Sequence, residues 1–338
     1  MKAWAVRFGW WLGLWVAALV VAFGCIWFLV KTRVVSAPSG VVARVGSVRT
    51  VIVRIATYNV RNYLSTNRIV DGQYKTDWPK PEAEKTALRA VIRQAHPDVL
   101  ALEEMGDAKE LEELRRDLAA EGADYPYSAL VSAADPDRHV ALLSRVPFAK
   151  VQKYEDVEYK LGQSSEKVKR GLLEADFVTA GQAWAFYAVH LKSRLNEEGD
   201  PTDPLSANRR EGEAHALRDL IRKQQPLLAG ALVAVVGDFN DTRDSVPLRR
   251  FLELDGKPLL HLVPAADSRG QTWTFTYPHA DTYERIDFVL LSAALLPWQK
   301  DAGTVVDIPE SEQASDHRLV WVDLAFPAGS EQPAAQGP

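Results

Sequence analysis

The 338-residue chain is long enough to bury a large hydrophobic core, and its 47% hydrophobic and 25% charged residues are typical of a folded globular protein. Residues 1–50 carry six basic residues and no acid, so the formal net charge of −5 becomes −11 for residues 51–338. This acidic balance argues against a tight nucleic-acid-binding module, and the single cysteine, Cys25, excludes an intrachain disulfide and a thiolate metal site.

The amino terminus contains an apolar segment that is long enough to cross a bilayer. Residues 8–30 form 23 consecutive residues without a charge, after Lys2 and Arg7. We therefore predict a membrane anchor over residues 1–30 rather than a cleaved signal peptide, whose apolar core would usually be shorter. Basic residues flank both sides of the segment, and we expect the folded domain to lie outside the cytoplasm.

Two further segments are predicted to lie outside the folded domain. Residues 31–50 contain proline, serine and glycine and are predicted to form a tether. Residues 327–338 consist largely of Ala, Gly, Gln and Pro and are predicted to be disordered. The folded domain is thus expected to span residues 51–326.

The first part of this domain is predicted to alternate between strands and helices. A strand at 51–55 runs on into Thr57-Tyr58-Asn59-Val60-Arg61-Asn62. Apolar residues then recur at helical spacing over 83–95, and His96-Pro97 ends that helix. An apolar strand at 98–102 leads into Glu103-Glu104, and a second amphipathic helix covers 108–120.

The second part is predicted to be richer in strands. Short strand-like runs with turn residues between them indicate antiparallel neighbours at 125–131, 139–143, 172–178 and 183–191. A helix at 207–223 precedes a valine-rich strand that ends at Gly237, and a short helix near 246–254 follows it. The last predicted strands are 272–275, 286–291, 304–307 and 319–326. Strands interleaved with a few helices, without strict alternation, predict an α+β sandwich of two stacked sheets covered by helices.

The valine-rich strand ends in the most informative polar residues of the chain. Asp238 and Asn240 follow Gly237, and an extended backbone through Phe239 would point both side chains to one face. A carboxylate and an amide at this position suit a hard cation and a phosphate oxygen. The alternative is an ordinary Gly-Asp-Asn turn after a strand.

Similar polar groups lie at the ends of several other predicted strands. Asn59 and Glu104 end the first two strands, His190 ends a later one, Asp287 begins another, and Ser315-Asp316-His317-Arg318 precedes the last. Each could have an ordinary role, in a solvated loop, a core or a turn. Together they are the set expected for attack of water on phosphorus with help from a divalent cation.

Seven short segments carry a resemblance to a known family. They are Thr57 to Asn62, Pro97 to Glu104, Ala141 to Arg145, His190-Leu191-Lys192-Ser193, Gly237-Asp238-Phe239-Asn240, Arg285-Ile286-Asp287 and Ser315 to Arg318. In this order they resemble the endonuclease/exonuclease/phosphatase superfamily, the metal-dependent phosphoesterases of the deoxyribonuclease I type. The resemblance covers about residues 51–326. It implies a four-layer α/β/β/α sandwich of two mixed β-sheets with an active site at one edge.

The resemblance also implies a metal site. Glu104 would be the main Mg²⁺ ligand, helped by Asn59 and Asp316, with Mn²⁺ or Ca²⁺ as alternative ions. Two departures from the family pattern concern this region. Glu103 replaces a frequent glutamine, and either adds a negative charge beside the cation or points away into the sheet. Arg61 stands where abasic-site endonucleases of the superfamily have an aspartate, which argues against a repair enzyme of that kind.

Five residues match the catalytic positions of the superfamily. Asp287 would orient His317, whose other ring nitrogen takes a proton from water or contacts the phosphate. Asp238 would position or deprotonate the water, and Asn240 would donate to a phosphate oxygen. His190 would bind phosphate or act as a general acid. Which group is the general base is left open.

Three basic residues are weaker candidates for contacts to phosphate. They are Arg61, Lys192 and Arg170, and each could equally be a structural or solvated side chain.

Three functions remain open at this point. The first is a nuclease of the endonuclease type, and the second is a phosphatase or a phospholipase C-type, sphingomyelinase-like hydrolase of a lipid or inositol phosphate. The third is an inactive tethered binding module, against which the intact ligand set argues. The expected partners are nucleic acid, or a phosphorylated small molecule or lipid, and a membrane through the amino-terminal helix. We expect a monomer.

Overall fold

The computed structural model describes residues 50–197 and 200–328. Within those ranges, no helix is both long enough and apolar enough to cross a membrane. The predicted anchor over residues 1–30, and all but the ends of the predicted tether and tail, lie outside the described residues and stay predictions.

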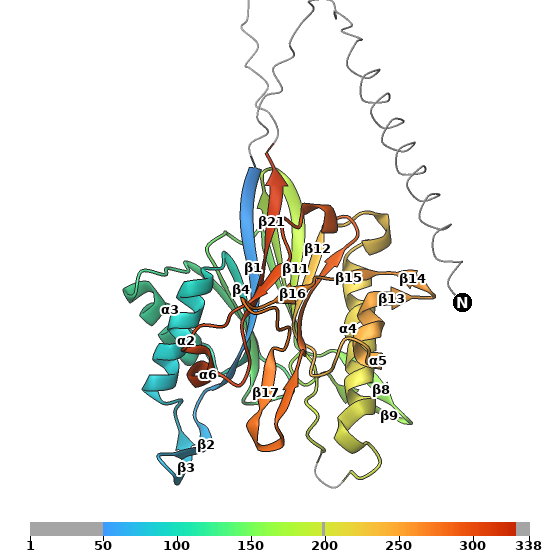
Figure 1. Cartoon of the computed structure of the whole chain (residues 1–338). Helices are drawn as coiled ribbons and strands as arrows, with labels where there is room; N and C mark the ends of the chain where they lie inside the picture. Colours follow the sequence, from blue (N-terminus) through green and yellow to red (C-terminus); the bar gives the residue numbers. More distant parts are fainter. Residues whose placement is uncertain (1–49, 198–199, 329–338) are drawn as a thin grey trace, which may run out of the picture. The chain divides into compact units, whose positions relative to one another are not determined.

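Two mixed β-sheets pack face to face and form the two central layers (Figure 1). The strands of the first sheet, in spatial order, are β16 (Ala265–Ala266), β20 (Gly303–Val305), β21 (Val320–Pro327), β1 (Thr50–Tyr63), β4 (Val99–Met105), β6 (His139–Ser144) and β5 (Tyr127–Val131). Those of the second are β15 (Leu260–Leu262), β19 (Asp287–Ser292), β12 (Val233–Asp238), β11 (Gln182–His190), β10 (Leu172–Thr179) and β7 (Lys150–Tyr154). The pairs β1/β4 and β11/β12 are parallel, and most other pairs are antiparallel.

The interior between the sheets is built by alternation along the strands. In β1, Val53 and Ile55 point between the sheets, while Ala56 and Tyr58 belong to the opposite, helix-covered face. Phe177 and Trp184 stack at a ring-centroid distance of 4.7 Å in the same inner layer. Because both faces are buried, the central strands are apolar throughout, as their sequences predict.

Helices form the two outer layers, so the predicted α+β sandwich is confirmed (Figure 1). The helices are α2 (Glu82–Ala95) and α3 (Ala108–Ala120) on the first sheet, α4 (Ala207–Gln224) and α5 (Val246–Leu252) on the second, and the short α6 (Ser311–Ala314) beside α2. Single-turn 3-10 segments are η1 (Pro204–Ser206), η2 (Leu227–Ala229), η3 (Pro278–Ala280) and η4 (Leu296–Trp298). Left-handed His96 ends α2 before Pro97, as expected, and Asp107 forms a capping box with Glu110 at the start of α3.

Four two-stranded ribbons project from the sheets. They are β2/β3 (Thr66–Val70 and Gln73–Trp78), β8/β9 (Glu158–Leu161 and Ser164–Lys167), β13/β14 (Glu253–Leu254 and Lys257–Pro258) and β17/β18 (Phe275–Tyr277 and Thr282–Glu284). The first three were not predicted from the sequence, and the helix predicted near 246–254 ends at Leu252 because Glu253–Leu254 form β13. The predicted strand at 272–275 is wrong except at its last residue. Thr274 instead lies between two segments, donating its N–H to Glu284 and accepting from the N–H of Arg318.

One edge of the sandwich collects the polar strand ends, and we call it the site edge. It is the edge where β1, β4, β11 and β12 finish and β19 begins. The opposite edge holds both ends of the described domain, because Thr50 of β1 pairs with Pro327 of β21. Asn59 lies nine residues further along β1, which is roughly 30 Å at 3.3 Å per residue.

Candidate active site

Gly237 controls how β12 delivers Asp238 to the site edge. Its φ of +145° is a conformation that side chains disfavour, and an added Cβ would lie 1.9 Å from the carbonyl oxygen of Val189. Glycine therefore allows β12 to lie directly against β11, where Gly237 pairs with Val189 and Asp238 pairs with His190.

The chain turns at Asn240, two residues after Asp238 ends the strand, which agrees with the Gly-Asp-Asn turn that the sequence left open as the alternative. Asn240 has φ +52°, and its backbone N–H donates to Oδ1 of Asp238 at 2.7 Å. The Asp238 carboxylate makes the turn favourable by accepting this bond, while Phe239 packs in the buried core. Asn240 is held at the edge by a 2.9 Å bond from Nδ2 to the carbonyl of Leu191.

Three predicted site residues converge on one oxygen atom, Oδ2 of Asp238. Nδ2 of Asn59 donates to it at 2.9 Å. Nε2 of His190 lies 3.7 Å away and Nε2 of His317 lies 3.8 Å away. These residues come from β1, β11, β12 and the segment before β21, so the fold brings both sheets together at this atom.

His317 and Asp287 form the predicted orienting pair. Nδ1 of His317 lies 3.0 Å from Oδ2 of Asp287, and the ring packs against Phe275 at a centroid distance of 4.9 Å. Burial alone would lower the pKa of His317, but the carboxylates of Asp287 and Asp238 outweigh it and hold this pKa well above its usual value. His317 therefore holds a proton at neutral pH, with Nε2 directed to Asp238.

The pKa values of Asp238 and His190 are shifted toward the neutral form of each side chain, in contrast to that of His317. Burial and the negative charge of Asp287 raise the pKa of Asp238 to about 7. Burial and the positive charges of Arg170 and His317 lower the pKa of His190 well below its usual value, so its imidazole is neutral. The cluster thus contains one protonated imidazole, one neutral imidazole and one carboxyl group that ionises near neutral pH.

The raised pKa of Asp238 gives a prediction for stability. Between about pH 4 and 7 its carboxyl group binds a proton in the folded chain but not in the unfolded chain, so wild-type stability falls as pH rises through this window. Asp238→Asn removes this loss. The free energy of unfolding of Asp238→Asn minus that of wild type is expected to rise by about 1 kcal/mol or more from pH 5 to pH 8. Urea unfolding in buffer containing a chelator measures this difference. A pH-independent difference would contradict the assignment.

Asn59 does not end its strand, in contrast to the prediction. β1 continues to Tyr63 with a register shift against β4, because Arg61 and Asn62 adopt positive φ. Oδ1 of Asn59 accepts from the N–H of Arg61, and its backbone carbonyl accepts from the Ser315 hydroxyl at 2.8 Å. The bulge turns Asn59 into the cluster.

Glu104 and Asp316 both contact residues of this bulge. Oε2 of Glu104 accepts from the N–H of Asn62 at 2.9 Å, and Oδ2 of Asp316 lies 3.5 Å from Nε of Arg61. Glu104 itself has φ +60° and is followed by Met105 as the last residue of β4, so it too is a bulge residue rather than the strand end. Their roles as metal ligands stay predictions.

Glu103 points into the space between the sheets. It is fully buried, and its Oε1 accepts from the Thr57 hydroxyl at 2.7 Å. Burial raises its pKa well above the usual value, and the charges of Asp287 and Asp238 add to the effect. Of the two sequence alternatives, the structure thus favours the one in which Glu103 points away into the sheet, as a neutral side chain.

Two of the three weak phosphate candidates, Lys192 and Arg61, already have partners. Nζ of Lys192 donates to the carbonyl of Leu195 at 2.7 Å, within its own loop. Arg61 lies beside Asp316, with about half of its side chain exposed. Neither contacts Asp238 in the described structure.

Sequence reasoning missed two residues that position the cluster. The Thr274 hydroxyl accepts from the N–H groups of Ile286 and Asp287, both at 3.1 Å, and the Ser315 hydroxyl accepts from the N–H of His317 at 3.1 Å. In the sequence, Thr274 is marked only as a small polar residue between Trp273 and Phe275. Ser315 is marked by its place directly before Asp316 and His317.

The donor set fits a hard divalent cation. Ligand atoms of Asp238, Asp287 and His317 lie within 4.8 Å of one another. Carboxylate groups concentrated in a buried site are stabilised by a cation. Of the predicted ligands, Asn59 lies next to this group through its bond to Asp238, while Glu104 and Asp316 contact Asn62 and Arg61.

The comparison with known families decides the assignment. The sequence pattern described as the endonuclease/exonuclease/phosphatase family matches residues 56–317. The chain belongs to the endonuclease/exonuclease/phosphatase family. Members are metal-dependent phosphoesterases, so this chain is an enzyme of that class. A search of curated proteins gave no match.

Solved structures of this family have the same fold. An endonuclease/exonuclease/phosphatase from Bacteroides vulgatus is 18% identical, with a TM-score of 0.57 over 81% of this chain and 98% of that chain. The human Nocturnin catalytic domain with bound sulfate is 17% identical, with a TM-score of 0.54 over 82% and 97%. Sphingomyelinase C from Streptomyces griseocarneus is 17% identical, with a TM-score of 0.54 over 81% and 99%. At these identities the likeness shows the fold alone.

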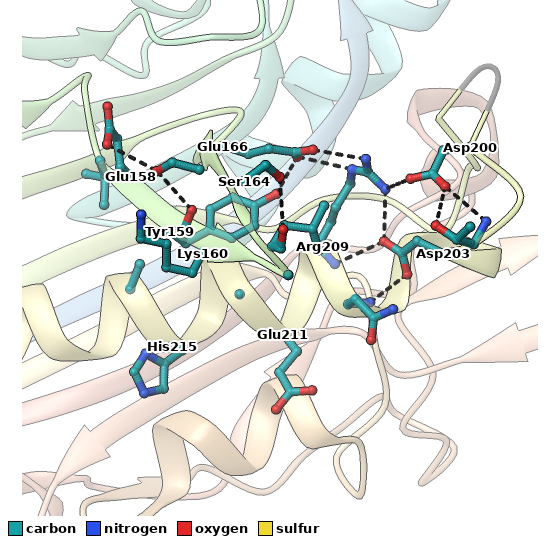
Figure 2. A pocket seen from close by; sticks show the side chains of 18 of the residues that line it. Glu158, Tyr159, Lys160, Ser164, Glu166, Asp200, Asp203, Arg209, Glu211 and His215 are labelled. Carbon is teal, nitrogen blue, oxygen red and sulfur yellow. Dashed lines mark hydrogen bonds and ion pairs between the residues drawn. The ribbon is translucent and has the colours of Figure 1, made fainter.

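A large hollow of about 1160 Å³ lies away from this site, between the β8/β9 ribbon and α4. Arg209 in its lining forms ion pairs with Glu166, Asp200 and Asp203 at N–O distances of 2.7 to 3.1 Å. Figure 2 shows these contacts as dashed lines. The charge of Arg209 is thus neutralised by the protein itself. The lining includes none of the cluster residues, so the hollow is separate from the family's active site.

Proposed function

We propose that this enzyme is a divalent-metal-dependent nuclease of the endonuclease type, which hydrolyses phosphodiester bonds by attack of water. The observation that carries this proposal is the convergence of Asn59, His190 and His317 on Oδ2 of Asp238. Two imidazoles in different protonation states around one carboxylate allow a proton to be accepted and a phosphate oxygen to be contacted in the same site.

The roles follow from the charge states. The Asp238 carboxylate, oriented by Asn59 and by the Asn240 N–H, accepts the proton of the attacking water. The His317 imidazolium, held by Asp287, stabilises negative charge on a phosphate oxygen. His190 is neutral and binds phosphate as a hydrogen-bond donor rather than acting as the acid. Asn240 has a second N–H, beyond the one given to Leu191, for the same phosphate.

A bound divalent cation would supply charge stabilisation at the phosphate. Glu104, Asn59 and Asp316 would hold it, next to the Asp238 cluster. The described geometry is consistent with Mg²⁺, and Mn²⁺ or Ca²⁺ are alternatives with the same oxygen preference.

Aromatic side chains beside the site suit a polymeric substrate. Tyr277 and Tyr283 on the β17/β18 ribbon are exposed, and this ribbon is tied to the site because Phe275 pairs with His317. Exposed rings next to a phosphodiesterase centre can stack on nucleic acid bases.

A phospholipase C-type activity on a lipid headgroup is the second candidate, and one observation favours it. On the β2/β3 ribbon, which follows the Asn59 segment, Ile69 is 74% exposed and Tyr74 is 66% exposed. Apolar side chains of this kind can enter a lipid interface. We further propose that the chain is anchored by residues 8–30 with the domain outside the cytoplasm, which would keep it near a membrane.

Metal removal tests the proposed class of reaction. After dialysis against a chelator, hydrolysis of bis(p-nitrophenyl) phosphate and plasmid DNA is expected to stop and to return with Mg²⁺, Mn²⁺ or Ca²⁺. Glu104→Gln is expected to raise the Mg²⁺ concentration for half-maximal activity about 10- to 100-fold, because a charged ligand is lost. Glu112→Gln, an exposed site on α3, is the matched control.

Three outcomes would contradict parts of this proposal. Full activity in chelator would exclude a metal-dependent mechanism. Turnover of sphingomyelin but not of DNA or RNA would move the assignment to the phospholipase. Wild-type Mg²⁺ affinity without turnover of any phosphoester would favour a binding module.

A further inference from the structure

The site edge has a second, cationic half that the proposed mechanism does not use. In the second sheet, β19, β12 and β11 deliver Asp287, Asp238 and His190 in this order, and the next strand is β10. Arg170 lies two residues before β10 begins. In the facing sheet, Arg138 directly precedes β6, whose first residue, His139, pairs with Met105 beside Glu104. Two arginines therefore follow His190 on the side away from Asp287.

Arg170 is buried with unused donors. Its relative exposure is 7%, and its Nε and Nη1 have no hydrogen-bond partner among the described residues. Asp135 balances the charge, with Oδ2 3.2 Å from Nε, but this contact lacks hydrogen-bond geometry. Buried guanidinium N–H groups without acceptors cost free energy, so the arrangement is suited to an anionic ligand that supplies them.

Asp135 ties both arginines to one local structure. Its Oδ1 accepts from the backbone N–H of Arg138 at 3.1 Å, and its own N–H donates to the carbonyl of Lys169 at 2.7 Å. Gly171, at φ +65°, turns the chain after Arg170, and a Cβ there would meet Tyr154 and Ala133. The Arg138 guanidinium has no carboxylate within ion-pair distance in the described part of the chain.

The positive charges of Arg170 and Arg138 both act on His190 in the catalytic cluster. After burial, the positive charges of Arg170, His317 and Arg138 are the main causes that lower the pKa of His190. In the pairing of β10 with β11, Leu173 lies opposite Ala188, so Arg170, three residues earlier, lies beside the end of β11 at His190. An arginine at this place can bind a group attached to the phosphate that His190 would contact. A planar guanidinium recognises phosphate by two parallel hydrogen bonds, which makes a second phosphate the best-matched ligand.

We propose that Arg138 and Arg170 form a subsite for a second phosphate, the one next to the reacting phosphate along a nucleic acid strand. The inference rests on the proposed nuclease function and narrows it. A choline headgroup would place a positive charge near the same arginines, which would repel it. The subsite therefore favours a nucleic acid over sphingomyelin.

Matched small substrates test the subsite directly. Thymidine carrying a p-nitrophenyl phosphodiester at one hydroxyl group is compared with the same ester carrying a phosphate at the other hydroxyl, in both regioisomers. The leaving group is the same in all of them, so the ratio of kcat/KM reports the second phosphate alone. Wild type is expected to prefer one bisphosphate isomer over its parent ester by about tenfold, the size of a charged hydrogen bond.

Arg138→Gln and Arg170→Gln are each expected to reduce this preference about tenfold, mainly through KM. Arg116→Gln, an exposed arginine on α3, makes the same change in net charge and is expected to keep the preference. The slope of log KM for single-stranded DNA against log salt concentration should fall by about 0.7 per arginine removed. Arg138 is partly exposed and has no ion-pair partner in the described chain, so its variant remains informative if loss of Arg170 impairs folding.

The possible failures are distinct. If wild type shows no preference, or both variants keep it, the subsite is wrong even though the esters are hydrolysed. Equal losses on parent and bisphosphate esters would assign the arginines to the reacting phosphate. The same ratio of kcat/KM can be measured for glycerophosphoinositol 4-phosphate against glycerophosphoinositol. If the second phosphate raises kcat/KM more in this pair than in the thymidine pair, the nucleic acid assignment is wrong. No hydrolysis of any ester would instead refute the proposed function.

Discussion

Asp238→Asn is expected to lower kcat for phosphodiester hydrolysis by about 10³-fold. The amide keeps the size of the side chain, and its single oxygen can still accept from the Asn240 N–H. Its NH2 group replaces the oxygen that accepts from Asn59, and the amide cannot accept a proton from water. Activity on bis(p-nitrophenyl) phosphate at saturating Mg²⁺ and pH 8 measures the effect. Folding is checked by thermal unfolding in the same buffer.

The matched control makes the same chemical change at an exposed position. Asp156→Asn lies between β7 and β8, where the carboxylate pairs with Lys167. This variant is expected to keep kcat within about twofold, because surface changes away from the site have small effects. A loss of activity in Asp238→Asn that is matched by a loss of folded protein would assign Asp238 to the fold rather than to the reaction.

Gly237→Ala is expected to lower the free energy of unfolding by about 3–5 kcal/mol. The new Cβ would meet the Val189 carbonyl at 1.9 Å, and the neighbour is backbone in the centre of the second sheet, which cannot move without breaking β11/β12 pairing. The φ of +145° adds strain for any side chain. Urea unfolding followed by circular dichroism measures the change.

Gly181→Ala separates the steric effect from the conformational one. Gly181 also has positive φ, at +80°, but a Cβ there would have no atom within 4 Å. Its alanine variant is expected to cost only about 1 kcal/mol, the typical cost of left-handed backbone without a clash. Equal costs at the two positions would show that the contact with Val189 is relieved by local movement.

The predicted helices agree well with the structure, because local signals determine them. The apolar spacing before His96-Pro97 gave α2, and α3 covers the residues that were predicted. Antiparallel pairing of β10 with β11 also follows from a short turn between two apolar runs. These features depend on neighbours in sequence, so periodicity and turn chemistry are sufficient to predict them.

The backbone conformation of the site could not be predicted from such local sequence signals. The bulge after Asn59 and the turn at Asn240 depend on positive φ at non-glycine residues, which tertiary hydrogen bonds stabilise. The β2/β3 and β8/β9 ribbons have polar, weakly alternating sequences, since neither strand face is fully buried. Asp135 contacts both Arg138 and Arg170, and its contact with Arg170 is long-range in sequence and has no sequence signature.

The pairing of Thr50 with Pro327 has a practical consequence for handling this enzyme. A fusion partner, affinity label or solid support joined directly to Thr50 or Pro327 would be attached roughly 30 Å from the reaction centre, at 3.3 Å per strand residue. A domain immobilised through Thr50 should therefore present its reactive face to the solution. Large polymers should reach that face as freely as small esters do.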